Sequence, residues 1–262
     1  MTAAISFQQV HKRFTRRGQT ITAIDNISFT VRTGEYVTVL GRSGCGKSTL
    51  INLLLGLNGT DGGQIRVMGI DPYADFDRLR NRIGCVFQTD RLLPWRHAID
   101  NALLPLEILN IREPEAWQSA ARWFERFGLK GFEKSFPSEL SGGMRQRVAL
   151  VRALVSDPDI LLADEAFGHL DVATGESLRR DFKRVAVEKG KTVLHVTHSI
   201  DEALELSDKI IVLGKPGTVL AAYENVNAGP RPELEAIRQD ILTHLYRGGW
   251  AEDESREDLS GR

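Results

Sequence analysis

Residues 41–49 read Gly-Arg-Ser-Gly-Cys-Gly-Lys-Ser-Thr, a glycine-rich turn that ends in a lysine and two hydroxyl residues. A β-branched run at 35–40 leads into it, and a helical pattern at 48–55 follows it. Such a glycine-rich turn lets backbone N–H groups surround an anion, to which the helix N-terminus adds its positive end. We expect the loop to bind a nucleotide, with Lys47 on the β and γ phosphates and the Ser48 hydroxyl on Mg²⁺. The predicted nucleotide-binding residues are Gly41, Arg42, Ser43, Gly44, Cys45, Gly46, Lys47, Ser48 and Thr49.

Two carboxylates follow the apolar run at 160–163, which has the length of a buried parallel strand. Asp164 ends that run, where it can order Mg²⁺ through water beside the phosphate loop. Glu165 comes next and points elsewhere, toward the position of an attacking water. We therefore expect it to be the general base, a role that typically supplies about 10²–10⁴-fold in rate. The alternative is a pair that only caps a strand end, which the phosphate loop disfavours.

A histidine follows another apolar run, at 192–197. His198 can hydrogen-bond a γ-phosphate and hold the attacking water, whereas a strand-end histidine without such neighbours is usually a surface residue. His195 lies on the same strand face as Thr197, so we expect it to be packed in the core. His198 therefore joins Glu165 as a candidate catalytic residue.

Residues 140–147 read Leu-Ser-Gly-Gly-Met-Arg-Gln-Arg, a glycine-rich turn that opens a basic helix. The N-terminus of that helix is a second place at which phosphate can bind. We expect Ser141 and the N–H groups of Gly142 and Gly143 to bind the γ-phosphate held by a second copy of the chain, because a separate lobe cannot reach its own phosphate loop. Two ATP molecules would then lie head to tail between two chains, and hydrolysis would let the pair reopen.

These ordered motifs resemble the ATP-binding subunit of ABC transporters, over about residues 3–248. The resemblance implies an ATPase, with ATP and Mg²⁺ as cofactors, that powers transport across a membrane. Phe14 matches the aromatic residue that stacks on adenine, and Gln88 matches the glutamine that senses Mg²⁺ and the water. Asp171 ends Gly168-His-Leu-Asp171, which matches the loop that touches the opposite subunit. Family positions are also matched by Gly41–Thr49, Leu140–Arg147, Asp164, Glu165 and His198.

Two residues depart from the pattern of that family. Ala166 stands where the family usually has proline, which would restrict Glu165 to extended backbone angles. His169 stands where the family usually has alanine, near the expected subunit boundary. Both departures bear on the rate of hydrolysis rather than on the family.

The run Leu92-Leu-Pro-Trp95 resembles the importers of nitrate, taurine and sulfonates. It is an apolar loop with a proline turn, placed where that family meets its transmembrane permease subunits; the alternative is an ordinary packed loop. The resemblance therefore implies uptake of a small anion. An ABC export subunit, a soluble ABC-type ATPase and a P-loop kinase stay open as alternatives, and the cargo is recognised by other chains.

Composition narrows the partners and the location. The chain has 262 residues, with 34 basic and 35 acidic side chains and a net charge of −1, which argues against nucleic acid as a partner. Two cysteines without paired spacing fit a reducing compartment. No apolar stretch reaches the roughly 18–20 residues that span a bilayer. We expect a peripheral protein on the cytoplasmic face of the inner membrane, held there by its permease, with a periplasmic or lipid-anchored solute-binding protein as an indirect partner.

The order of elements predicts an α/β fold, namely a P-loop NTPase core with a mainly parallel sheet, an antiparallel β subdomain and an inserted helical subdomain. We assign residues 1–250 to one ATPase domain, with its core at 1–88 and 157–230 and the helical subdomain at about 89–156. An amphipathic helix at about 232–247 docks on that core or extends an interface. Residues 251–262 are charged and lack periodicity, which predicts disorder.

Overall fold

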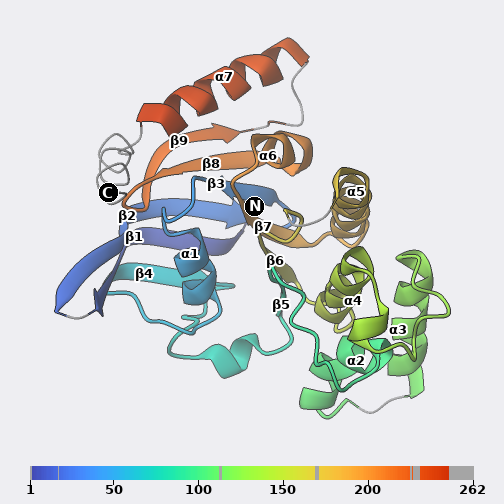
Figure 1. The fold of residues 1–262 in the computed structure, drawn as a ribbon. Helices are drawn as coiled ribbons and strands as arrows, with labels where there is room; N and C mark the ends of the chain where they lie inside the picture. Colours follow the sequence, from blue (N-terminus) through green and yellow to red (C-terminus); the bar gives the residue numbers. More distant parts are fainter. Residues whose placement is uncertain are drawn as a thin grey trace, which may run out of the picture. The chain divides into compact units, whose positions relative to one another are not determined.

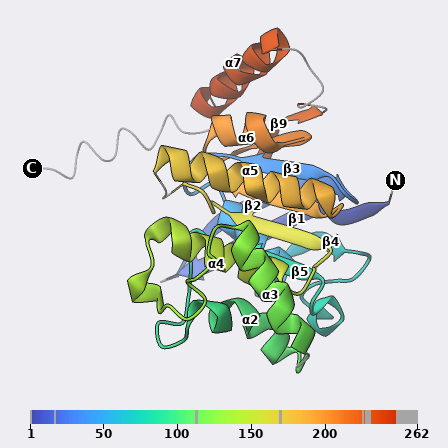
Figure 2. The same cartoon turned by 90° about the vertical axis from the view of Figure 1, so that its right-hand side faces the viewer.

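The structure is a computed structural model that describes residues 2–16, 18–111, 114–168, 171–224, 226 and 231–247. The described residues up to Leu79 and from Leu194 onward form one compact unit, and those from Arg80 to Val193 form another. Figures 1 and 2 show the elements of both units. His169 and the charged segment 251–262, on which the sequence carried specific expectations, lie outside the described residues.

The first unit contains an antiparallel sheet, in which β1 (Ala3–Arg16) pairs with β2 (Gln19–Arg32) on one side and β4 (Gly62–Val67) on the other. Ile27, Phe29 and Val31 of β2 are buried, and the residues between them are exposed. This alternation is expected of an antiparallel sheet that covers a core with one face. It agrees with the antiparallel β subdomain that the sequence predicts.

The same unit contains the strand that leads to the phosphate loop. β3 (Tyr36–Leu40) lies between the end of β7 (Thr192–Thr197) and β8 (Lys209–Gly214), and β9 (Thr218–Glu224) follows at the edge. β3 runs parallel to β8, whereas β9 is antiparallel to it. Every residue of β3 is buried, which explains its unbroken run of apolar and β-branched side chains. The helix α1 (Lys47–Leu54) begins directly after the loop.

Two helices near the C-terminus complete the first unit, α6 (Ile200–Leu206) and α7 (Arg231–Arg247). In both ribbon views α7 lies along β9 and α6 (Figures 1 and 2). Ile241 and Leu245 of α7 belong to a core cluster with Leu40 and Val212, whereas Tyr246 is exposed. One apolar stripe of α7 therefore packs on its own unit.

The second unit combines a strand pair with four helices among its described residues. β5 (Ile83–Val86) runs parallel to β6 (Ile160–Asp164). The helices are α2 (Ala98–Ile108), α3 (Pro114–Arg126), α4 (Gly142–Leu154) and α5 (Val172–Glu188). A Cβ added at Gly84 of β5 would lie 2.3 Å from the carbonyl oxygen of Ala153, so α4 approaches β5 at a distance that a side chain would prevent. Short 3-10 helices occur at Phe76–Leu79, in the first unit, and at Pro137–Glu139.

The combination of parallel strand pairs, an antiparallel sheet and flanking helices confirms the predicted α/β class. Within the described ranges, no helix is both long and apolar enough to cross a membrane.

Candidate active site

The phosphate loop begins at the carboxyl end of β3. The N–H of Gly41 donates to the carbonyl oxygen of Thr197, at the end of β7, over 3.2 Å. Gly46 has a left-handed φ of 99° immediately before α1, and a Cβ added there would lie 2.5 Å from the carbonyl oxygen of Ala23. Only glycine meets both conditions without strain. Residue 46 is therefore fixed by backbone geometry rather than by side-chain chemistry.

Lys47 lies across the loop that precedes it. The residue is 5% exposed, and its Nζ donates to the carbonyl oxygens of Gly41 at 2.7 Å and Arg42 at 3.0 Å. The ammonium is thus held beside the N-terminus of α1, whose N–H groups add positive potential. A cation and a helix N-terminus at one place are the chemistry that binds the phosphates of a nucleotide.

A magnesium ion would find oxygen donors of the expected kind here. Ser48 is exposed in the first turn of α1, so its hydroxyl is available to an ion bound beside the loop. No group of three or more His, Cys, Asp or Glu side chains that could hold a metal by themselves occurs in the described part of the chain.

The end of β7 is organised by hydrogen bonds around His198, which is itself exposed. The Thr197 hydroxyl donates to the Glu202 carboxylate at 2.6 Å and accepts from the Ser199 N–H at 3.0 Å. Ser199 caps α6 by accepting from the N–H of Glu202 at 3.3 Å. Together these bonds fix the backbone on both sides of His198. His195 is fully buried, which confirms that it is a packed residue.

Phe14 lies on β1 of the same unit and is 38% exposed. The Nζ of Lys12 lies 5.4 Å from the centre of the Phe14 ring and 3.0 Å from a carboxylate oxygen of Asp61. An exposed ring with a cation near its face offers a surface on which a flat base can stack.

In the second unit, the structure brings Gln88 and Glu165 together although 77 residues separate them in sequence. Both follow the carboxyl ends of paired parallel strands, since Val86 pairs with Ala163. The Gln88 Nε2 donates to Glu165 Oε2 over 3.3 Å. Asp164, the last residue of β6, is half-buried. The predicted glutamine and the predicted base therefore form one hydrogen-bonded pair.

The backbone at Glu165 explains the consequence of Ala166. Glu165 has a φ of 47°, in the left-handed region. A proline at 166 would push residue 165 toward extended angles. Ala166 leaves Glu165 free to take the left-handed conformation in which it contacts Gln88.

The glycine-rich turn at 140–147 has the predicted geometry of a helix start. Ser141 is the N-cap of α4, and its hydroxyl accepts from the Met144 N–H at 3.2 Å. Ser141 and Gly142 are exposed. A Cβ added at Gly143 would lie 2.6 Å from the Thr174 methyl group, so close packing against α5 is one reason for glycine there.

Asp171 caps the next helix. Its carboxylate accepts from the Thr174 N–H at 3.0 Å, and this backbone hydrogen bond lowers the pKa of Asp171 below its usual value. The lowered pKa keeps the side chain ionised to more acidic pH than an ordinary aspartate. His169 and Leu170, just before it, are outside the described residues.

Each unit thus assembles a group of predicted residues. In the first unit the loop is hydrogen-bonded at Gly41 to Thr197, the residue before His198. In the second unit Gln88 meets Glu165, and Ser141 begins α4. The structure gives contacts to two buried side chains that had no assigned role, Glu202, which accepts from the Thr197 hydroxyl, and Gln146 of α4. The pattern Ser199-x-x-Glu202 is a helix-start signature that points to the first, whereas Gln146 lies inside the motif 140–147, which does not indicate its two carbonyl partners.

Comparisons with known proteins address the same residues. The profile of the ABC transporter family matches residues 24–168. The chain is 38% identical over 250 residues to the aliphatic sulfonates import ATP-binding protein of Bacillus cereus, covering 94% of this chain and 97% of that protein. It is 41% identical over 213 residues to the taurine import ATP-binding protein of Rhizobium johnstonii, covering 80% and 79%. The chain belongs to the ABC transporter family.

Solved structures agree with this assignment. A dimeric ATP-binding cassette in a post-hydrolysis state, bound to ADP and phosphate, superimposes with a TM-score of 0.76 at 35% identity, covering 84% of this chain and 98% of that one. The family resemblance and the fold class inferred from the sequence are therefore confirmed. As a member of the ABC transporter family, the chain has its phosphate loop inside the matched region.

Replacing Lys47 with alanine tests the phosphate loop. We expect ATP binding to fall below detection in a calorimetric titration, because each charge-assisted hydrogen bond to phosphate is worth about 1.5–3 kcal/mol, or roughly ten- to hundredfold in affinity. Lys130→Ala is the matched control, since Lys130 is an exposed lysine of the other unit whose Nζ pairs with Glu125 at 2.6 Å on the surface. Unchanged ATP affinity in Lys47→Ala would contradict the assignment.

Proposed function

We propose that this chain is the ATP-hydrolysing subunit of an ABC importer that takes up a small anion of the sulfonate, taurine or nitrate kind. The observation that carries the proposal is the match over 94% of the chain to an aliphatic sulfonates import ATP-binding protein. The taurine import relative supports the same class of cargo, because taurine is itself an aminosulfonate. The phosphate loop and the Gln88–Glu165 pair supply the chemistry that such a subunit needs.

Hydrolysis begins with a bound and oriented triphosphate. The N–H groups of the loop and the Lys47 ammonium bind the β and γ phosphates, and Phe14 stacks on the adenine. Ser48, Asp164 and Gln88 would hold Mg²⁺, which neutralises the charge of the phosphate oxygens when it is bound. Holding the triphosphate by charge and backbone dipoles is the main catalytic contribution in phosphoryl transfer.

Glu165 acts on the attacking water. Its carboxylate accepts a proton while the water oxygen bonds to the γ phosphorus and the bond to the ADP oxygen breaks. Gln88, which donates to Glu165 at 3.3 Å, orients that carboxylate. His198 hydrogen-bonds the γ-phosphate from the end of β7, where Thr197 and Ser199 fix its backbone. Inorganic phosphate and ADP are the products.

A second copy of the chain completes each nucleotide site in this proposal. Ser141, Gly142 and Gly143 of one copy bind the γ-phosphate held in the loop of the other, and Asp171 lies in the segment that touches the partner. The exposure of Ser141 and Gly142 at the N-terminus of α4 supports this arrangement. The dimeric state of the cassette with ADP and phosphate supports it as well. Hydrolysis removes the bridging phosphate, so the two copies separate.

The permease contact is assigned to the loop that carries Trp95, which is 72% exposed. The backbone of this loop is hydrogen-bonded to the side chain of Asn101, which is fully buried. Asn101 Oδ1 accepts from the Leu93 N–H at 2.6 Å, and its Nδ2 lies 3.1 Å from the carbonyl oxygens of Leu93, Arg96 and His97. A large apolar side chain on a rigid support is typical of a protein interface rather than of a packed loop.

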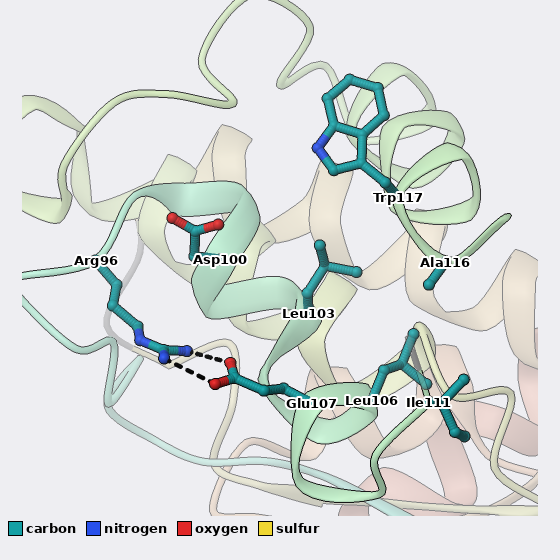
Figure 3. Close-up of a pocket in the computed structure, with 8 residues that line it drawn as sticks. All are labelled: Arg96, Asp100, Leu103, Leu106, Glu107, Ile111, Ala116 and Trp117. Atoms are coloured by element: carbon teal, nitrogen blue, oxygen red, sulfur yellow. Dashed lines mark hydrogen bonds and ion pairs between the residues drawn. The ribbon is translucent and has the colours of Figure 1, made fainter. Parts of the chain in front are cut away.

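A hollow of about 320 Å³ adjoins this loop on α2 and α3. In Figure 3, the Arg96 guanidinium forms a two-pronged ion pair with Glu107, at 2.6 and 3.1 Å, while Leu103 and Trp117 face the open space. Trp117 is 51% exposed. The hollow is lined by Arg96, Asp100, Leu103, Leu106, Glu107, Ile111, Ala116 and Trp117. We assign it to a cytoplasmic segment of the permease, which would bury Trp95 and Trp117 together.

We also propose a domain organisation for this chain and a location for it in the cell. Residues 1–250 form one ATPase domain, with a core at 1–88 and 157–230 and a helical subdomain at about 89–156 that contains α2, α3 and α4. Two copies bind transmembrane permease subunits at the cytoplasmic face of the inner membrane, as peripheral proteins. A periplasmic or lipid-anchored solute-binding protein delivers the cargo to the permease and is an indirect partner. Nucleic acid has no role.

Replacing Glu165 with glutamine tests the hydrolysis step. The amide keeps the shape of the side chain but cannot take a proton, so we expect phosphate release to fall at least about 100-fold. ATP binding should persist, and the ATP-bound pair should accumulate as a dimer in size-exclusion chromatography with light scattering. Glu176→Gln, an exposed residue of α5, should behave like the unmodified chain. A variant that stays monomeric with ATP would count against the shared site.

Replacing Trp95 with alanine tests the permease contact. The ATPase activity of the isolated subunit should stay within about twofold, because exposed side chains contribute little to stability. Uptake of a labelled sulfonate by the complete transporter should be lost. Tyr73→Ala is the control, since Tyr73 is 63% exposed in the other unit. Loss of both activities would indicate a packing role for Trp95.

A further inference from the structure

We propose that Gln146 is a positioning residue for hydrolysis, which holds the segment carrying Gln88 and the turn carrying Glu165 at a fixed separation. The proposal rests on the proposed ATPase function. Gln146 lies in the first turns of α4 and is 5% exposed. In this proposal Gln146 does not touch the nucleotide or the attacking water.

Two hydrogen bonds from one amide carry the inference. The Gln146 Nε2 donates to the carbonyl oxygen of Phe87 at 3.1 Å and to that of Ala166 at 2.8 Å. Phe87 immediately precedes Gln88, and Ala166 immediately follows Glu165. A glutamine amide has two N–H donors, so each carbonyl can receive one.

These bonds close a ring with the catalytic pair. The strands β5 and β6 are paired up to Val86 and Ala163. Beyond this pair, the hydrogen bonds of the sheet no longer hold the two following segments together. The Gln88–Glu165 hydrogen bond of 3.3 Å joins the two side chains, and Gln146 joins the backbones next to them, at Phe87 and Ala166. Hydrogen bonds linked in this way restrict one another more than separate bonds do. The ring therefore sets where the Glu165 carboxylate points.

The helix α4, which carries Gln146, is itself fixed to the segment that follows β5. Arg152, two turns further along α4, donates to the carbonyl oxygens of Asp90 at 2.6 Å and Arg91 at 2.8 Å. Arg145 donates through Nε to the Asp90 carboxylate at 3.0 Å. Gly84 lets the backbone of β5 approach α4 closely. Three hydrogen bonds thus fix Asp90 and Arg91 to α4, and Gln146 extends the same attachment to Phe87 and to the turn after β6.

The two carbonyl oxygens at this position require a side chain that has the length of glutamine and two N–H donors. Methionine has a similar length but no donor, and glutamate would place carboxylate oxygens against two carbonyl oxygens. A residue that only stabilised the fold would lower the melting temperature and the amount of ATP bound per chain together, because unfolded chains bind no ATP. A positioning residue lowers kcat while ATP binding persists, because a small misplacement of a catalytic group costs rate rather than affinity.

The experiment compares the full chain with Gln146→Met and Gln146→Glu by steady-state hydrolysis of Mg-ATP and by calorimetric ATP binding. We expect kcat to fall about 10- to 100-fold while KM and the dissociation constant stay within about twofold. Gln118→Glu is the control, because Gln118 is an exposed glutamine of α3. The same Gln146 variants are then made in a Gln88→Ala background, where we expect most of their effect on kcat to disappear, since both act through Glu165.

Three results would overturn the proposal. The first is an unchanged kcat, and the second is a parallel loss of kcat and ATP affinity. The third is a double variant whose fold-loss in kcat equals the product of the losses in the Gln146 and Gln88 single variants. Failure of both Gln146 variants to fold would also overturn it, because it would make Gln146 a structural residue. If the unmodified chain binds ATP but does not hydrolyse it, the proposed function fails instead, and this inference fails with it.

Discussion

The sharp backbone reversal between β3 and α1 is the constraint on which the rest of the site depends. Gly46 is left-handed and approaches Ala23 too closely for any side chain, so the loop has one path available. Lys47 then folds back onto the carbonyl oxygens of Gly41 and Arg42. Because β3 is buried along its whole length, the loop starts from a fixed strand. A loop with so little backbone freedom would lose little conformational entropy on binding an anion, which lowers the cost of binding.

The helix α4 has a comparable role in the second unit. Its first residues, Ser141 and Gly142, are exposed at the end that would meet a partner's phosphate. Its side presents Gln146 and Arg152 to the backbone around Gln88. In the proposed mechanism, α4 connects the end that binds a partner's phosphate to the segment that leads to Trp95. Movement of α4 would then be transmitted from the nucleotide site toward the permease contact.

Local patterns predicted the parts of this molecule whose causes are local. The phosphate loop, the strands at 36–40 and 160–164, and the helix after Ser141 depend on neighbouring residues, and each occurs where it was expected. The hydrogen bond between Gln88 and Glu165 and the two bonds of Gln146 join residues far apart in the chain, so only the folded sheet reveals them. The left-handed backbone at Glu165 also depends on this packing, although the absence of proline at 166 indicated that position 165 was less constrained.

In the proposed dimer, each nucleotide is held by the loop of one copy and the α4 N-terminus of another. A mixture of two inactive variants distinguishes this arrangement from a site within one chain. Lys47→Ala removes the loop function, and Gly142→Asp places a negative charge at the start of α4, where the nearest atom to an added Cβ is 3.8 Å away. In a shared site, the mixed dimer regains one intact site of two, so an equal mixture should recover up to about a quarter of the unmodified ATPase activity. A mixture as inactive as its components would show that each chain holds its nucleotide alone.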